Sequence, residues 1–324
     1  MEGCCSMDRK DPMIALSTSW KSSRVDNGEA LIEAVLGFKV TGVELEYRIT
    51  GKMFHQMRTL LKRSGLAIVS IHNYFPAPTD EKGLKPGGDM LSLSNPDRDK
   101  RNLAVKKTMG TFEAANDLEA PVVVLHCGFV EMEAEIQALH HYYTSGRIQS
   151  PEAKQFIKEK KFLLAGRKGR HLDCLLFSLE RLSVAAERLG ITIALENRYY
   201  YRELPGPEDF GLIFSRLDGA PLGYWHDTGH AHANEVLGWI PEGMLLEKFE
   251  NRLVGTHLHD ARGLEDHLPP GSGEIDFSRV LACLKPGTPR VLELEPGTPD
   301  QEVESAIEYL TKMGFADPPN ETAS

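Results

Sequence analysis

Short apolar runs, many of them β-branched, recur along the chain, and stretches with helical periodicity lie between them. This alternation is typical of repeated βα units. The runs predict eight strands, at 14–18, 42–47, 67–72, 122–126, 191–196, 222–227, 253–259 and 290–295. The helices predicted between them include 28–37, 53–64, 103–118, 174–189 and 302–313.

Eight βα units in a chain of 324 residues favour a closed (β/α)8 TIM barrel over an open doubly wound sheet, which is the alternative architecture. No glycine-rich dinucleotide fingerprint or phosphate loop follows the first predicted strand, and this argues further against the open sheet. We therefore expect a single-domain barrel over residues 13–315, with flexible tails at 1–12 and 316–324. A helical, basic, lid-like insertion is expected at about 129–170.

The composition narrows the class of protein. With 41% hydrophobic residues, 26% charged residues and a net charge of −10, the chain fits a soluble globular enzyme and disfavours nonspecific binding to nucleic acid. Its apolar runs are far shorter than the roughly 20 residues of a membrane helix, and its N-terminus lacks a secretory pattern.

Five scattered cysteines without a CxxC pair indicate a reducing, cytoplasmic location. A homodimer is the default assembly.

The candidate chemistry lies at the C-terminal ends of the predicted strands, where TIM barrels carry their active sites. Eight of the twelve histidines fall at these ends or just beyond them: His72, His126, His226, His230, His232, His257, His259 and His267. The acidic residues at the same ends are Glu196, Asp227, Glu293 and Glu295. Because strand side chains alternate between faces, Glu196 shares the face of Thr192 and Ala194 and points to the barrel axis.

Imidazoles and carboxylates that converge on one barrel mouth are costly to bury unless a cation lies among them. A divalent metal is the simplest such cation. Mixed nitrogen and oxygen donors suit Zn²⁺ or Mn²⁺, with Co²⁺ or Fe²⁺ as alternatives, better than Mg²⁺ or Ca²⁺. The competing interpretation is that each of these side chains only makes a hydrogen bond at the end of its strand and binds no metal. This explains one such residue well, but it explains the whole set poorly.

Four segments carry a resemblance to the xylose isomerase-like TIM-barrel superfamily, which includes sugar isomerases, ketose epimerases and the endonuclease IV apurinic-site hydrolases. The first two are LEN at 195–197 and HDTGHA at 226–231. The third is 257–277, which contains both HLHDARG and DHLPPGSGEIDF, and the fourth is VLELEP at 291–296. The resemblance extends from about residue 13 to residue 313.

The resemblance implies specific roles for these residues. In the isomerases and epimerases, one divalent ion is held from the fifth to eighth strands, which implies the ligands Glu196, Asp227, His257 and Glu293, with Glu295 as the competitor on the last strand. The glutamates of the fifth and eighth strands also transfer the proton, so Glu196 and Glu293 are the implied acid and base. The histidine that matches His230 contacts substrate, and we expect it to steady a developing oxyanion.

The endonuclease IV branch implies a larger metal set of three zinc ions. Its additional ligands match His72, His126, His230 and His267, and Glu265 stands where that branch has an aspartate. The resemblance therefore leaves between one and three ions per chain open, and His72 and His126 bind either substrate or a second ion.

Two further features concern the substrate. Tyr199, Tyr200 and Tyr201 follow Glu196 between Arg198 and Arg202. Aromatic rings commonly stack on sugars and arginines commonly bind carboxylate or phosphate, so we expect Arg198 to lie nearest the substrate. The basic residues within 129–170 form either a solvated helix face or a phosphate-binding rim over the barrel mouth.

The leading hypothesis is a metal-dependent isomerase or epimerase of a small sugar, sugar acid, cyclitol or sugar phosphate, acting by proton transfer through an enediolate. The alternative is a multinuclear zinc phosphodiester hydrolase of the endonuclease IV type, acting on apurinic DNA. A third possibility is a non-catalytic barrel that binds metal or sugar, because a fold does not determine a function.

Overall fold

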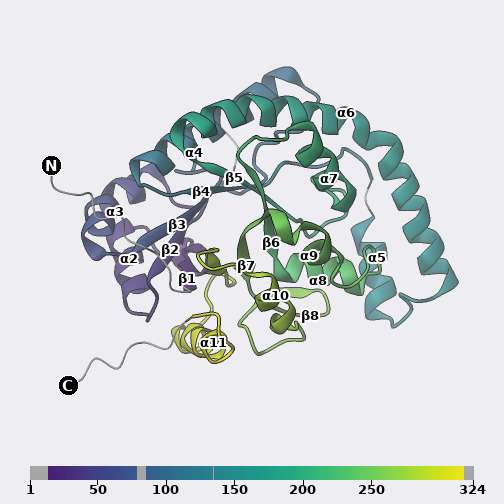
Figure 1. The fold of residues 1–324 in the computed structure, drawn as a ribbon. Helices are drawn as coiled ribbons and strands as arrows, with labels where there is room; N and C mark the ends of the chain where they lie inside the picture. Colours follow the sequence, from purple (N-terminus) through teal and green to yellow (C-terminus); the bar gives the residue numbers. More distant parts are fainter. Residues whose placement is uncertain (1–13, 79–84, 134, 317–324) are drawn as a thin grey trace.

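The computed structural model describes residues 14–78, 85–133 and 135–316. Eight parallel strands close into a barrel, in which β10 lies between β7 and β1 (Figure 1). They are β1 (Ile14–Ser17), β2 (Gly42–Leu45), β3 (Ala67–His72), β4 (Val122–Leu125), β5 (Thr192–Glu196), β6 (Leu222–Asp227), β7 (Leu253–Leu258) and β10 (Arg290–Leu292). The predicted TIM barrel and its eight strands are confirmed. The predicted tails lie outside the described residues, except for Ala316.

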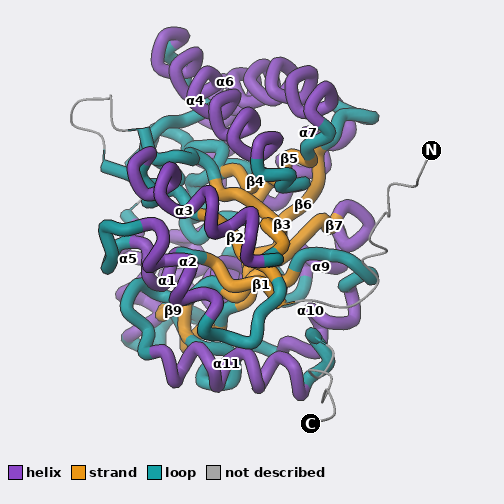
Figure 2. The backbone as a smooth tube through the Cα atoms, turned by 90° about the vertical axis from the view of Figure 1, so that its left-hand side faces the viewer, coloured by secondary structure: helices purple, strands orange, loops and turns teal. Residues whose placement is uncertain are grey.

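The helices form a layer around the strands (Figure 2). They are α1 (Ser19–Ser22), α2 (Gly28–Leu36), α3 (Gly51–Ser64), α4 (Arg98–Asp117), α5 (Ile136–Thr144), α6 (Pro151–Leu189), α7 (Pro207–Arg216), α8 (Thr228–Val236), α9 (Met244–Phe249), α10 (Phe277–Cys283) and α11 (Asp300–Lys312), with a 3-10 turn at Glu250–Arg252. An antiparallel hairpin of β8 (Asp260–Arg262) and β9 (Glu265–Leu268) follows β7.

Helix α6 is much longer than the helix predicted at 174–189, with 39 residues. It begins where the Ser150 side chain accepts a hydrogen bond from the Ala153 amide and Pro151 occupies the first turn, and it ends at Gly190, which has a φ of 68°. Both are standard helix boundaries. The basic stretch of the expected lid thus forms the first half of α6, which extends past the barrel toward α5 (Figure 1).

The apolar residues are divided between two places. A large cluster fills the layer between strands and helices, and a small one fills the barrel interior, where Trp225 is the largest side chain. Trp225 fits there because Gly255 on the next strand has no side chain: a Cβ at Gly255 would lie 1.9 Å from the Trp225 ring. The indole packs edge-on against the imidazole of His257, with ring centroids 5.1 Å apart. The tryptophan therefore forms an apolar floor beneath the polar barrel mouth.

Candidate metal centre at the barrel mouth

Four buried side chains from four neighbouring strands meet at the C-terminal end of the barrel. The ligand atoms of Glu196, Asp227, His257 and Glu293 all lie within 4.8 Å of one another. The Nδ1 atom of His257 is 3.1 Å from Glu196 Oε1 and 3.0 Å from Glu293 Oε2. These are the four residues that the resemblance implied as ligands. Three carboxylates in a buried cluster require a compensating positive charge, so their donor set fits a divalent cation.

The sequence left two candidates for the metal ligand of the eighth strand, Glu293 and Glu295, and the structure distinguishes between them. Strand β10 ends at Leu292, and the Glu293 amide donates to the Leu258 carbonyl at 3.1 Å. Glu293 is buried within the cluster, whereas Glu295 is exposed. Both residues lie beyond the last residue of β10, so strand alternation does not decide between them.

Glu44, on β2, is a site residue that the sequence analysis missed. It is fully buried, and both of its carboxylate oxygens lie 3.1 Å from His257 Nε2. The Ser17 and Ser70 hydroxyls donate to it at 3.0 and 2.7 Å. With the Nε2 proton donated to Glu44, Nδ1 of His257 faces the carboxylate cluster, where a bound cation would replace its proton, as in other carboxylate–histidine–metal arrangements. Burial opposes charge on His257, but Glu293 and Glu44 raise its pKa well above the usual value.

Asp227 is fixed from three directions. Its Oδ1 accepts a hydrogen bond from the His230 amide at 2.7 Å and thereby caps α8. The side chain of Asn197 accepts from the Asp227 amide at 2.8 Å and donates to the Asp227 carbonyl at 2.9 Å. The Nε2 atom of His259 lies 3.0 Å from both carboxylate oxygens. The sequence analysis noted His259 at a strand end but did not assign it to the site. Its spacing of two from His257 was a usable signal, because residues two apart on a strand share a face.

A second group of candidate metal donors is formed by His72, His126 and Glu196, and Arg198 lies beside it. Glu196 Oε2 lies 2.8 Å from His126 Nε2 and 3.4 Å from His72 Nε2. One guanidinium nitrogen of Arg198 contacts His126 Nε2 and lies 3.4 Å from the same Glu196 oxygen. A positive charge of the protein therefore lies against two of the three donor residues of this group.

Asp89 completes this group and was not predicted, because it follows no strand. Its Oδ2 lies 2.8 Å from Arg198 Nη2 and 3.1 Å from His126 Nδ1. Burial and Arg198 both lower the pKa of His126, but Asp89 and Glu196 outweigh them and raise it to about 9. The same Nη2 atom of Arg198 lies 3.5 Å from Glu203 Oε1. The guanidinium is thus surrounded by carboxylates.

The third group corrects a sequence assignment. His230 and His267 lie beside Asp266, at 3.8 and 3.3 Å, and not beside Glu265, which is exposed. The resemblance to the endonuclease IV branch implied an acid two positions before His267, at Glu265. In the structure His267 has a left-handed φ of 57°, so strand alternation does not hold across this part of the hairpin.

His230 is held by a hydrogen bond to the backbone of Asn197. Its Nδ1 atom lies 3.0 Å from the Asn197 carbonyl, which can only accept, so the ring proton resides on Nδ1. Burial lowers the pKa of His230, which keeps the imidazole neutral. In the neutral form, Nε2 carries the lone pair, which can accept a hydrogen bond or bind a cation.

These groups surround a cavity of about 360 Å³. Its lining includes Arg198, as expected, and also Tyr199 and Tyr200, whereas Tyr201 is buried and stacks on Trp239 with ring centroids 4.3 Å apart. The basic residues of α6 do not line it, so they form no phosphate-binding rim here. The full lining is Tyr47, His72, Asp89, His126, Glu196, Arg198, Tyr199, Tyr200, Glu203, His230, Asp266, His267 and Glu293.

Among the described residues, no helix is both long enough and apolar enough to cross a membrane.

Comparison with known proteins agrees with the fold. The family model of the xylose isomerase-like TIM barrel matches residues 32–313. The uncharacterized protein MJ1311 of Methanocaldococcus jannaschii is 30% identical over 192 residues, which are 57% of this chain and 53% of that protein. The match thus spans about half the length of this relative.

Solved structures share the fold at low sequence identity. A D-tagatose 3-epimerase-like protein has a TM-score of 0.64 at 21% identity, covering 93% of this chain and 96% of its own. The 3-keto-D-glucoside 4-epimerase YcjR of E. coli has a TM-score of 0.64 at 14% identity, with 93% and 99% covered. The TTHB071 protein of Thermus thermophilus, soaked with ZnCl2, has a TM-score of 0.58 at 19% identity, with 93% and 97% covered.

Proposed function

We propose that this chain, which belongs to the xylose isomerase-like TIM-barrel family, is a metal-dependent isomerase or epimerase of a small uncharged carbohydrate. The observation that carries the proposal is the position of Arg198 between His126 and Glu196. A guanidinium there supplies the charge that a second ion would otherwise supply. The centre formed by Glu196, Asp227, His257 and Glu293 is then a one-ion site. Structural relatives named as sugar epimerases support this class.

The residues fit a divalent ion such as Mn²⁺ or Zn²⁺, because the outward-facing atoms of His257 and Asp227 are already bound by Glu44 and His259. When bound, such an ion polarises a substrate carbonyl and stabilises the negative charge of an enediolate. Asp227 and His257, fixed by their buried partners, serve to hold it.

Glu196 and Glu293 transfer the proton in this proposal. They reach the cavity from β5 and from the end of β10, so they approach a substrate from different sides of the mouth. One carboxylate removes the proton beside the carbonyl, and the other returns a proton to the same or the neighbouring carbon. His230 accepts a hydrogen bond from a substrate hydroxyl at Nε2. Tyr199 and Tyr200 offer aromatic surface to the sugar ring.

The charge of the cavity favours an uncharged substrate over a sugar phosphate or sugar acid. Its lining carries five carboxylates, and its single guanidinium is already paired with three of them. A phosphate or carboxylate group would find no unpaired cationic side chain in this lining, and binding would place like charges close together. We therefore expect neutral ketoses, aldoses, glycosides or cyclitols to be turned over in preference to phosphorylated ones.

A second candidate function is supported by the group of His230, Asp266 and His267, which provides a further set of metal donors. With two or three ions, the site would suit a phosphodiester hydrolase of the endonuclease IV type. The two functions differ in the number of ions that they require.

The test combines metal content with proton exchange. Protein purified without chelator is expected to contain one ion per chain by elemental analysis. Incubation with neutral sugars in deuterated water is expected to place deuterium beside a carbonyl, detected by NMR. Glu196→Gln should abolish the exchange, while Glu302→Gln, on the exposed face of α11, should retain it. Two or three ions together with cleavage of apurinic DNA would establish the hydrolase, and metal or sugar binding without either reaction would establish a non-catalytic barrel.

A further inference from the structure

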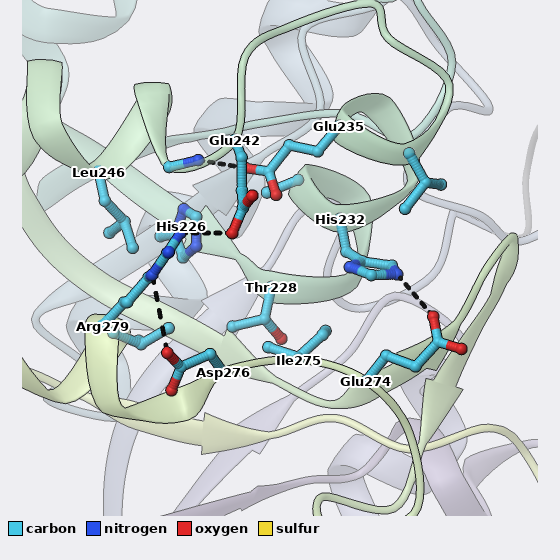
Figure 3. A pocket seen from close by; sticks show the side chains of 14 residues that line it. His226, Thr228, His232, Glu235, Glu242, Leu246, Glu274, Ile275, Asp276 and Arg279 are labelled. Atoms are coloured by element: carbon cyan, nitrogen blue, oxygen red, sulfur yellow. Dashed lines mark hydrogen bonds and ion pairs between the residues drawn. The ribbon is translucent and has the colours of Figure 1, made fainter. Parts of the chain in front are cut away.

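A second cavity, of about 390 Å³, lies outside the barrel between α8, α9 and α10 (Figure 3). It shares no lining residue with the cavity at the barrel mouth. His226 contributes to its wall from β6, where it faces the helices while its neighbours Trp225 and Asp227 face the barrel interior. Its volume is in the range of small-molecule sites.

His226 presents an unprotonated nitrogen to this cavity. The side-chain oxygen of Asn197 accepts from the Asp227 amide and therefore cannot donate, so the Tyr224 hydroxyl donates to it at 3.0 Å. The hydroxyl has one hydrogen, so it must accept from His226 Nδ1, which lies 2.7 Å away. The proton of neutral His226 is thus on Nδ1, and Nε2 carries a lone pair.

This lone pair has no hydrogen-bond partner among the described residues, although the side chain is only 4% exposed. Buried polar atoms are rarely left without a partner. A ligand that donates a hydrogen bond would satisfy this one.

The charged residues around the cavity indicate that such a ligand is positively charged. Four carboxylates line it, and the single guanidinium, Arg279, is paired with Glu242 at 2.6 Å and with Asp276 at 3.7 Å. The two remaining carboxylates belong to Glu235 and Glu274. Among the hydrogen bonds of the described residues, Glu235 accepts one from the Gly243 amide at 2.9 Å, and Glu274 accepts one from the Gly263 amide at 3.2 Å while facing His232 at 3.6 Å.

The same residues do not form a preorganised metal site. No group of three donor atoms within 4.8 Å of one another occurs in this cavity among the residues that the structure describes. Its wall also contains apolar side chains from all three helices, Ala231, Val236, Leu246 and Val280, with Ile275 just before α10. An acidic cavity with an apolar wall and separated acceptors matches an organic cation with a carbon chain.

We propose that this cavity binds a short alkyl diamine. One amino group donates to His226 Nε2 and Glu235 at the inner end, and the other pairs with Glu274 at the more exposed end. The carbon chain between them lies along the apolar wall. This site is independent of the reaction at the barrel mouth, so it can be tested whatever that reaction is.

The experiment is titration calorimetry of the metal-loaded protein with 1,4-diaminobutane. We expect one site per chain, with Glu235→Gln and Glu274→Gln each weakening binding at least ~5-fold through the loss of a charge-assisted hydrogen bond. Glu247→Gln is the matched control, because this exposed carboxylate on α9 does not line the cavity. Glu196→Gln tests for binding at the barrel mouth instead. Both of these variants should bind like the wild type.

Three results would overturn the proposal. The first is the absence of diamine binding to the wild-type protein at millimolar concentration. The second is binding that Glu196→Gln weakens and that Glu235→Gln and Glu274→Gln leave unchanged, which would place the diamine at the barrel mouth. The third is tighter binding of succinate than of 1,4-diaminobutane, which would show that the cavity prefers an anion to a cation.

Discussion

The Nε2 atom of His257 lies 3.1 Å from both carboxylate oxygens of Glu44, a residue more than 200 positions earlier in the chain. This contact fixes the ring so that Nδ1 faces the three carboxylates of the candidate metal centre. Glu44 touches none of the other three candidate ligands in the hydrogen bonds of the described residues, so its effect on the centre passes through His257. It is a positioning residue.

Replacing Glu44 with Gln should weaken metal binding ~10–100-fold, the usual effect of losing a carboxylate that orients a metal-binding histidine. Gln keeps the size of the side chain but removes the charge. Titration of metal-free protein with Mn²⁺ would measure the change. Glu33→Gln, at an exposed position on α2, serves as the control. An unchanged Mn²⁺ affinity in Glu44→Gln would show that the orientation of His257 does not depend on Glu44.

Replacing Arg198 with Met should raise the metal content from one ion per chain toward two. The guanidinium lies against His126 and Glu196, and its removal takes a positive charge away from the buried group of His72, His126 and Glu196 and leaves space for an ion there. Elemental analysis after dialysis against Zn²⁺ would measure the content. Arg202→Met is the matched control, because Arg202 packs on Phe129 and does not line the cavity. A content that stays at one ion would contradict our explanation of the one-ion site.

Replacing Gly255 with Ala should destabilise the fold by about 1–3 kcal/mol, the usual cost of overpacking a core. The new Cβ would lie 1.9 Å from the Trp225 ring, which the closed barrel prevents from moving away. Urea denaturation would measure the change in the free energy of unfolding. Gly169→Ala, in α6 with no atom near its Cβ, should instead stabilise by about 0.5–1 kcal/mol through helix propensity. Equal effects of both substitutions would argue against this packing.

Replacing Glu46 with Gln should stabilise the protein in a pH-dependent manner. Burial raises the pKa of Glu46 from 4.5 to about 7, although Arg48 and Ser22 oppose the shift. Between these values the folded state binds the proton more tightly than the unfolded state, so the wild type loses stability as the pH rises from 4.5 to 7.

The advantage of Glu46→Gln should therefore grow over this interval by ~3 kcal/mol and remain constant above pH 7. Urea denaturation of both proteins at pH 5 and pH 8 would measure it. Glu187→Gln, at an exposed position on α6, should show no such trend. A constant difference between Glu46→Gln and the wild type at the two pH values would mean that the carboxyl group has an ordinary pKa.

The sequence by itself determined the local features of the protein. The alternation of apolar runs and helical stretches predicted the eight strands, and strand alternation directed Glu196 to the barrel axis, because both depend on residues a few positions apart. The location of the site could then be predicted from the histidines and acids at the strand ends, because the parallel strands of a barrel bring their C-terminal ends to one mouth.

The tertiary structure decided which of these residues meet. It selected Glu293 over Glu295 and Asp266 over Glu265, because β10 ends early and His267 breaks the alternation of its hairpin. It also brought Glu44 to His257 and Asp89 to Arg198, pairs whose members lie far apart in the chain. Such contacts depend on how the strands are staggered when the barrel closes and on the paths of its loops, and no local pattern of residues encodes either.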